Sequence, residues 1–340
     1  GEHEEDSDES DNGKKCEMLL YLEKRYISPR TREIDVPVVI TQVWIRELAL
    51  MQEPKDRDAD LVKHLLHSLA DLVQAEEYIL EFKNLHQMKA TGSCQVAKLT
   101  ENKFRNRYRN VLPFDENRVK LRNQANDYIN ANNICMKVGQ SELRYIACQG
   151  PTPETVSDFW VMVWQEQVSV LVMLTQEVEG GKVKCHPYWP QTKEDVLLAD
   201  KGMLVVTLAR SYQLEDFTVN QMYIENKDTR STREVTQIQY TSWPDHGVPE
   251  TALPLLKLLQ IVHLLEDGSA PIIHCSAGIG RTGSFIAVDT ALATIEQGLQ
   301  LDLPEIVREM RSQRYGMIQT TDQYLFCYSA CMEALLSLVK

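Results

Sequence analysis

The stretch Ala270-Pro-Ile-Ile-His-Cys-Ser-Ala-Gly-Ile-Gly-Arg-Thr-Gly283 joins a short apolar run to a helical pattern. Residues 271–274 include β-branched side chains and predict a buried strand. From residue 282 onward, apolar side chains recur at helical spacing until Gly298. A loop that runs from a strand into a helix points successive backbone N–H groups at one place, where the helix dipole adds positive potential. We therefore expect this loop to bind a doubly charged anion.

Two side chains of the loop suggest covalent chemistry, because Cys275 opens it and Arg281 closes it. A thiol at a helix N-terminus beside an arginine has a lowered pKa and can act as a nucleophile at neutral pH. Arg281 stays charged, and its planar fork matches two oxygens of one phosphoryl group. Gly278 and Gly280 permit the close backbone approach that such a cradle needs. We interpret Cys275 as a nucleophile; the alternative is a small buried core residue.

The same loop also spells G-x-G-x-x-G from Gly278 to Gly283, which is the fingerprint of dinucleotide-binding proteins. That fingerprint expects a second strand that ends in an acidic residue about 20 positions further on. Residues 299–304 (LQLDLP) are too short and too bounded by proline for a central strand. The fingerprint also leaves Cys275 and Arg281 without a role. A dinucleotide site is therefore the weaker interpretation.

The composition is that of a globular protein, with 340 residues, 43% of them hydrophobic and 25% charged. No apolar run approaches the roughly 18 residues that a membrane span needs. The net charge of −13 argues against a nucleic-acid partner. The chain opens with Gly1 and without a signal-peptide pattern, which indicates a processed or cloned fragment.

The eight cysteines are scattered and include no C-x-x-C pair. This distribution predicts neither a disulfide framework nor a zinc ribbon, and we expect no metal and no cofactor. A thiolate enzyme needs a reducing environment, so we expect a cytoplasmic location.

Three regions differ in their patterning. Residues 1–33 begin with an acidic tail and predict a disordered segment. Residues 34–90 predict a helical lead-in that packs on the main domain, with a partner-binding surface as the alternative, and 58–85 in particular have the apolar stripe of one amphipathic helix. Residues 91–340 predict a single α/β domain with strands in the middle and helices toward the end. Within it, 168–174 (VSVLVML) is an apolar strand of the kind buried on both faces.

A basic cluster lies at residues 103–109 (KFRNRYR). In an acidic protein we interpret it as a positive rim that steers a phosphate-bearing ligand, rather than as a nucleic-acid patch. Tyr108 within it is either a core residue or a flat wall for an aromatic substrate.

Several separate motifs, in order along the chain, resemble those of phosphotyrosine-specific protein tyrosine phosphatases. The resemblance covers about residues 100–335. The matching motifs are the phosphate-binding loop at 274–283, the mobile acid loop at 243–249 (WPDHGVP), the substrate-depth loop at 107–108 with the strand at 126–130, and the water-handling loop at 319–323 (QTTDQ).

Three further segments, 148–151, 156–160 and 176–180, are similar to a non-receptor branch of this family. That branch contains the very large phosphatase with FERM and PDZ domains and the small non-receptor type 20. The family implies a single-domain α/β fold, with a central twisted mixed sheet flanked by helices and an N-terminal helical extension. It also implies phosphotyrosine-containing proteins as partners, and we expect a monomeric catalytic domain.

The resemblance assigns proton transfer to Asp245. A departing tyrosine phenolate needs a proton because the pKa of tyrosine is near 10. Asp245 would donate that proton and later accept one from the attacking water, while Trp243 would anchor the loop as it closes. The alternative is that residues 243–249 are only a surface turn, since Pro, Asp and Gly favour turns.

The resemblance also assigns the remaining roles. Gln319 would orient the hydrolytic water with support from Gln323, Thr282 would hydrogen-bond the thiolate, and His274 would support the loop. Phosphate binding falls to the loop residues Ser276, Ala277, Gly278, Ile279, Gly280 and Arg281.

Two further residues support the site by resemblance, and one departs from the pattern. Glu179 would hold Arg281 through a salt bridge and Lys184 would meet the closed acid loop; a surface ion pair is the alternative for both. Asn110 stands where many relatives have an aspartate that binds the substrate backbone. It keeps an acceptor and loses the charge, which predicts a weaker or differently selective grip on the peptide.

Two other functions remain open at this point. One is a phosphotyrosine-binding scaffold whose catalysis is incidental, against which Asp245, Cys275 and Arg281 all count. The other is a dual-specificity or phosphoinositide phosphatase that uses the same loop. Tyr108 distinguishes these enzymes, because a deep pocket with an aromatic wall keeps the shorter phosphoserine out of reach.

Overall fold

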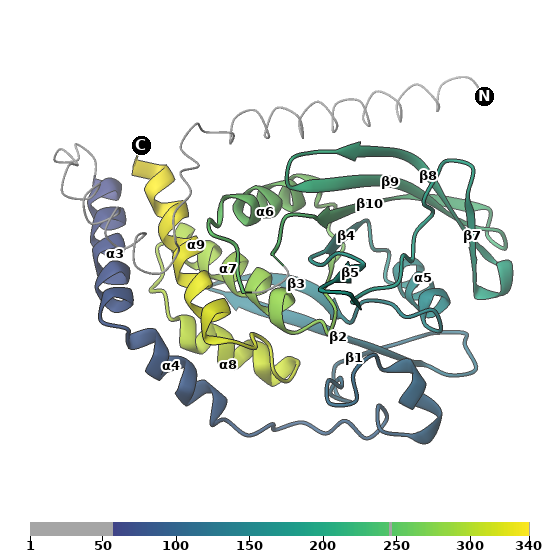
Figure 1. The fold of residues 1–340 in the computed structure, drawn as a ribbon, viewed down its shortest axis with the longest axis horizontal. Helices are drawn as coiled ribbons and strands as arrows, with labels where there is room; N and C mark the ends of the chain where they lie inside the picture. The colour runs from purple at the N-terminus through teal and green to yellow at the C-terminus, as the bar shows by residue number, and fades with distance from the viewer. Residues whose placement is uncertain (1–56, 245–246, 340) are drawn as a thin grey trace.

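The computed structural model describes residues 57–244 and 247–339, with a nine-stranded sheet through its centre (Figure 1). Its strands are β1 (Arg118–Lys120), β2 (Tyr128–Val138), β3 (Ser141–Cys148), β4 (Val170–Met173), β7 (Val196–Ala199), β8 (Leu204–Gln213), β9 (Phe217–Asn226), β10 (Ser231–Tyr240) and β11 (Ile272–His274). They lie in the order β1-β2-β3-β11-β4-β10-β9-β8-β7. β11 is parallel to β3 and β4, and β4 is parallel to β10, whereas the other neighbours are antiparallel. The predicted mixed sheet is confirmed.

Helices cover both faces of this sheet. The described helices are α3 (Arg57–Gln74), α4 (Glu77–His86), α5 (Val156–Gln165), α6 (Leu253–Leu265), α7 (Gly280–Glu296), α8 (Leu303–Gln313) and α9 (Thr321–Val339), with short 3-10 turns η1 (Thr100–Arg105) and η2 (Asp200–Gly202). One hydrophobic core joins α3, α4 and α6–α9 to one face, and a second core joins α5 to the other. None of the helices in the described ranges is long and apolar enough to cross a membrane.

The strand β4 shows why the sheet is buried on both faces. Val170 and Val172 belong to one core, while Leu171 and Met173 belong to the other, as the two-residue period of a strand requires. All four side chains are at most 3% exposed. The register aligns the last residue of β11, His274, with Met173 and Cys148. These parallel strands therefore end together, and the loops that follow them converge at one edge.

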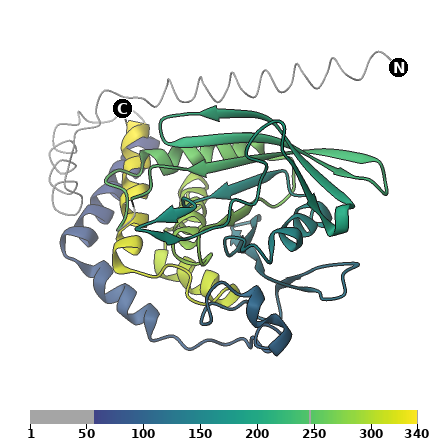
Figure 2. The same ribbon diagram turned by 45° about the vertical axis from the view of Figure 1, so that its right-hand side comes forward.

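The lead-in helices differ from the single helix expected over residues 58–85. Glu76 adopts a left-handed conformation with φ of 56° and separates α3 from α4. Leu61 on α3 and Ile79 on α4 are 64% and 44% exposed, although both belonged to the predicted apolar stripe. Figures 1 and 2 both place α3 beside α9, and the two helices are in contact. The predicted acidic segment 1–33 and residues 34–56 lie outside the described residues.

Candidate active site

The loop between β11 and α7 is built around its glycines. Gly278 has φ of +77°, and a Cβ added there would lie 2.2 Å from the carbonyl oxygen of Cys148. A Cβ on Gly280, the first residue of α7, would lie 2.4 Å from Oε1 of Gln319. Larger residues would therefore push the loop away from the strand end or from the neighbouring glutamine.

The thiol of Cys275 lies at the bottom of this loop and is only 5% exposed at the residue level. Its Sγ accepts from the backbone N–H of Gly278 at 3.3 Å and from the hydroxyl of Thr282 at 3.2 Å. Both groups donate to the sulfur and hold it in place. Thr282 follows Arg281 in the first turn of α7, so the start of this helix surrounds the sulfur with donors.

His274 precedes the cysteine and is fully buried. Burial, together with nearby Arg107, lowers the pKa of His274 to about 4, so the ring is neutral at pH 7. Its Nδ1 lies 3.2 Å from the carbonyl oxygen of Cys275 and its Nε2 lies 2.7 Å from the hydroxyl of Tyr188. Because a carbonyl only accepts, Nδ1 carries the proton and Nε2 accepts from Tyr188. Both nitrogens are thus used in holding the loop.

Arg281 is fixed by a fork of hydrogen bonds to Glu179. Its Nη1 and Nη2 lie 2.7 Å and 2.9 Å from the two carboxylate oxygens, and Nη1 also donates to the carbonyl oxygen of Leu174 at 2.9 Å. The Glu179 side chain is 3% exposed and that of Arg281 is 15% exposed. The pair is therefore buried rather than a surface ion pair, and its bidentate geometry sets the plane of the guanidinium.

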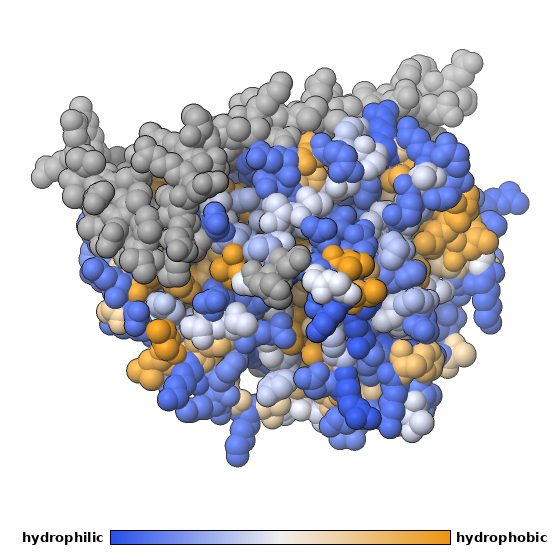
Figure 3. All heavy atoms as spheres, viewed as in Figure 1, coloured by the Kyte–Doolittle hydropathy of each residue, from blue (hydrophilic) through white to orange (hydrophobic). Residues whose placement is uncertain are grey.

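Glu179 and Lys184 come from one hairpin beside the loop, formed by β5 (Val178–Glu179) and β6 (Lys182–Val183). Lys184 contacts the loop through its main chain, because its carbonyl oxygen accepts from the hydroxyl of Ser276 at 2.8 Å. On the outer face of the hairpin, Val178 and Val183 are 53% and 64% exposed. Figure 3 shows hydrophobic side chains at the place where Figure 1 labels β5.

Tyr108 lies at the rim of the loop rather than in the core. Its hydroxyl lies 2.6 Å from Oγ of Ser276, and the residue is half-buried. Neighbouring Arg107 is used structurally, since it donates to the carbonyl oxygens of Gly150 at 2.9 Å and Pro151 at 2.5 Å. Asn110 is exposed two residues further along the chain. The hydroxyl of Tyr108 therefore ties this residue to the loop that carries the thiol.

Gln319 lies just before α9 and Gln323 lies within it. The backbone N–H of Gln319 donates to Oε1 of Gln323 at 2.8 Å. Both side chains approach Gly280, where an added Cβ would come within 2.4 Å of Gln319 Oε1 and 2.9 Å of Gln323 Nε2. The structure thus brings both glutamines to the loop that carries the thiol.

Comparison with known proteins identifies this arrangement. A family model described as "Protein-tyrosine phosphatase" matches residues 102–333. The chain belongs to the protein-tyrosine phosphatase family. Human tyrosine-protein phosphatase non-receptor type 13 is 42% identical over 255 residues, which are 75% of this chain and 10% of that protein. Mouse non-receptor type 20 is 40% identical over 263 residues, covering 77% and 61% respectively.

Human tyrosine-protein phosphatase non-receptor type 2 is 42% identical over 243 residues, which are 70% of this chain and 58% of that protein. The predicted resemblance to non-receptor members of the family is therefore confirmed. The chain spans only about a tenth of the type 13 phosphatase and about three fifths of the type 2 and type 20 relatives.

The segment 243–249 is described only in part, because Asp245 and His246 lie outside the described residues. Its base is well packed. Trp243 is 2% exposed, and its ring lies 5.5 Å from those of Tyr240 and Phe326. The carbonyl oxygen of Pro244 accepts from Nη2 of Arg281 at 3.3 Å. The residue before Asp245 thus contacts the arginine of the phosphate loop.

Sequence reasoning missed Arg314, a fully buried arginine just beyond α8. It donates to the carbonyl oxygens of Gly278 at 2.9 Å and Ala277 at 3.0 Å. Its other contacts are the amide oxygens of Asn130 and Asn132 at 2.9 Å and 3.0 Å. By binding these carbonyls, Arg314 fixes the orientation of the loop backbone. The sequence signal that could have indicated a buried arginine is the polar strand around Asn130, because buried amide side chains in a strand need hydrogen-bond partners.

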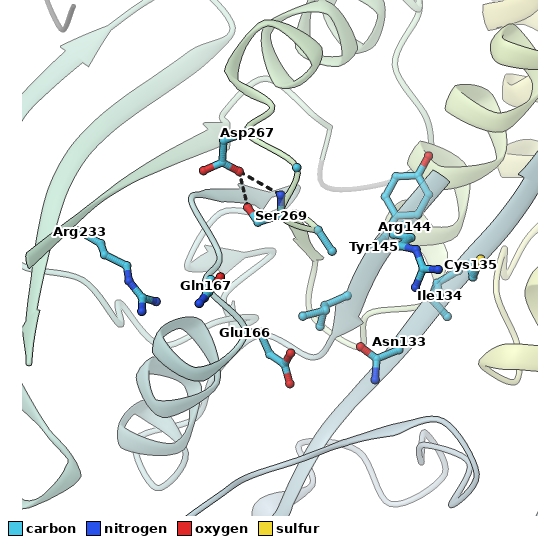
Figure 4. A pocket seen from close by; sticks show the side chains of 13 residues that line it. Asn133, Ile134, Cys135, Arg144, Tyr145, Glu166, Gln167, Arg233, Asp267 and Ser269 are labelled. Carbon is cyan, nitrogen blue, oxygen red and sulfur yellow. Dashed lines mark hydrogen bonds between the residues drawn. The ribbon is translucent and has the colours of Figure 1, made fainter. Parts of the chain in front are cut away.

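A separate pocket lies at the other end of the parallel strands (Figure 4). Its lining includes Gln167 and Ala270, which precede β4 and β11, whereas Cys275 follows β11. Arg144 and Arg233 lie at its edges together with Glu166, so positive and negative charges alternate around it. The pocket is therefore distinct from the candidate active site.

Proposed function

We propose that this chain hydrolyses phosphotyrosine in proteins through a phosphocysteine intermediate on Cys275. The single observation that carries the proposal is the position of this thiol. It accepts hydrogen bonds from Gly278 and Thr282 at the bottom of a loop whose arginine is held by a buried carboxylate. This combination suits an anionic sulfur facing a phosphoryl group.

In the first half-reaction the backbone N–H groups of residues 276–280 bind the phosphoryl oxygens together with the N–H groups of Arg281 that Glu179 and Leu174 do not use. The Cys275 thiolate attacks phosphorus, and the bond from phosphorus to the phenolic oxygen breaks with its electron pair on oxygen. Asp245 supplies the proton for that oxygen. The contact of Arg281 with the Pro244 carbonyl supports this assignment, because it brings the acid loop to the phosphate.

In the second half-reaction water attacks the phosphocysteine. Gln319 orients the water, and Asp245, now a carboxylate, accepts its proton. The sulfur–phosphorus bond breaks and the pair of electrons returns to Cys275, where the hydroxyl of Thr282 stabilises the thiolate. The 3.2 Å contact between Thr282 and Sγ supports this role. Inorganic phosphate then leaves, and no metal or cofactor takes part in our proposal.

The choice of phosphotyrosine rests on Tyr108. Its hydroxyl is bonded to Ser276, which supports a role for the ring as the aromatic wall against which the phenyl ring of the substrate stacks. A phosphoserine is shorter and cannot bring its phosphate to the same depth. We also propose that the chain acts on phosphotyrosine proteins in the cytoplasm, and that residues 91–340 form a monomeric catalytic domain.

Turnover of matched peptides tests the proposed function. With a chelator present, we expect hydrolysis of a phosphotyrosine peptide and at least about a hundredfold lower kcat/KM for the same peptide carrying phosphoserine. A loss of activity with the chelator would indicate a different mechanism. Comparable turnover of both peptides would instead indicate a dual-specificity enzyme.

Replacing Tyr108 by alanine should weaken this selectivity. Loss of an aromatic wall should cost on the order of 1 kcal/mol beyond the lost contact area, which raises KM for phosphotyrosine and relaxes the bias against phosphoserine. The matched control is Tyr108→Phe, which keeps the ring and removes the hydroxyl bonded to Ser276. An unchanged kcat/KM for both peptides in Tyr108→Ala would show that the ring does not contact substrate.

A further inference from the structure

Arg311 on α8 ties the lead-in helix α4 to the segment that carries Gln319. Its Nη1 donates to the last-turn carbonyl oxygen of Leu85 at 3.1 Å and lies 3.2 Å from Nδ1 of His86. Its Nε and Nη2 donate to the carbonyl oxygens of Met317 and Ile318 at 2.9 Å and 2.7 Å. One guanidinium therefore joins the end of α4 to the two residues before Gln319.

The segment beside Arg311 needs such support. Ile318 has φ of 66°, a left-handed conformation that is unfavourable for a β-branched residue and persists only where its surroundings hold it. Its N–H donates to the carbonyl oxygen of Ile279 in the phosphate loop at 2.8 Å. Arg311 holds the same residue from the other side through its carbonyl oxygen. The backbone entering Gln319 is thus fixed between the phosphate loop and α4.

The same lead-in helix also holds the start of α9. The Glu81 carboxylate accepts from the hydroxyl of Tyr324 at 2.9 Å and from that of Tyr328 at 2.5 Å. The rings of Phe82 and Tyr324 lie 5.4 Å apart. Tyr324 directly follows Gln323, the residue that receives the N–H of Gln319. The segment with both glutamines is therefore attached to α4 at its two ends.

We propose that α4, through Arg311 and the start of α9, positions Gln319 for hydrolysis of the phosphocysteine. This inference rests on the proposed function. It concerns chiefly the second half-reaction, because Arg281 is held by Glu179 and Leu174, and Cys275 by the start of α7. The lead-in helix α4 then acts on the catalytic unit through Arg311 and α9.

The variant Arg311→Lys tests this positioning role by pre-steady-state turnover of p-nitrophenyl phosphate. A lysine keeps the charge, but it cannot bridge the Leu85 carbonyl and the Met317–Ile318 carbonyls with one planar fork. We expect steady-state kcat to fall about tenfold, because displacing a catalytic group by about 1 Å can slow a reaction by up to roughly a hundredfold. The rate constant of the p-nitrophenol burst should stay within about twofold, and its amplitude should approach one per enzyme.

The matched control is Arg308→Lys, one turn earlier on α8, where the arginine pairs only with surface Glu305 in the described contacts. It should leave both phases unchanged. Glu81→Ala provides a second variant that weakens the α4–α9 contact without touching Arg311, and it should slow the same phase. If Arg311→Lys and Glu81→Ala lost burst rate and kcat in parallel, the inference would be overturned. It would also be overturned if neither the burst nor the steady-state rate changed in these two variants. An inactive wild-type chain would instead refute the proposed function.

Discussion

Turnover of a phosphotyrosine peptide is expected to stop when Cys275 is replaced by serine. A hydroxyl is far less acidic than a thiol and needs an adjacent base to become a nucleophile. His274 cannot serve, because its Nε2 accepts from Tyr188 and its Nδ1 proton is directed at a carbonyl oxygen. The variant should therefore show no turnover above background.

Binding should survive the same substitution. The loop N–H groups and Arg281 do not depend on the sulfur, and oxygen can accept from Gly278 and Thr282 as sulfur does. Calorimetry should give a peptide Kd within about tenfold of the KM of wild type. The control is Cys135→Ser, a half-exposed thiol on β2 far along the chain from the loop, which should keep full kcat. Sustained turnover by Cys275→Ser would contradict a cysteine nucleophile.

The second large effect is expected for Asp245→Ala. Without the acid the phenolate leaves unprotonated, so kcat should fall by roughly 10²–10⁴. KM should not rise, because the lost interaction belongs to the transition state. The alkaline limb of the kcat/KM profile should flatten, since it reports the protonated carboxyl group. The measurement is kcat and kcat/KM against pH with a phosphotyrosine peptide.

A second substrate sharpens this test. A phosphate ester with a more acidic phenol needs less help from a proton donor, so Asp245→Ala should lose less activity on p-nitrophenyl phosphate than on the peptide. Glu250→Ala is the matched control, because it removes an exposed carboxylate just beyond the same loop. Near-normal kcat of Asp245→Ala on the peptide would mean that residues 243–249 form only a turn.

The phosphate loop and the sheet could be predicted from sequence because their signals are local. A β-branched strand, a glycine-containing loop and a helical period follow one another within residues 270–298, and β4 is apolar along its whole length. The family resemblance then named Glu179 as the partner of Arg281, a pairing that no local pattern encodes. These two residues lie about a hundred positions apart in the chain and meet only in the fold.

The features that could not be predicted from the sequence depend on single backbone angles or on contacts between residues far apart in the chain. The apolar period over residues 58–85 continues through Glu76, so nothing in it marks the left-handed turn that splits the helix. In the sequence, Arg314 looks like one more basic residue near the end of a polar helix, yet it is fully buried in the structure. Its partners, Asn130 and the carbonyls beside Gly278, come from elements far apart in sequence. Arg311 was missed for the same reason.

Trapping the phosphoenzyme tests the central claim most directly. Wild-type protein is mixed with a phosphotyrosine peptide, the reaction is stopped by rapid denaturation during turnover, and the digested chain is examined by mass spectrometry. The mechanism predicts one phosphoryl group on the peptide that contains Cys275, absent in Cys275→Ser and more abundant in Arg311→Lys. A phosphoryl group on another residue, or active turnover with no phosphoenzyme at any quench time, would contradict it.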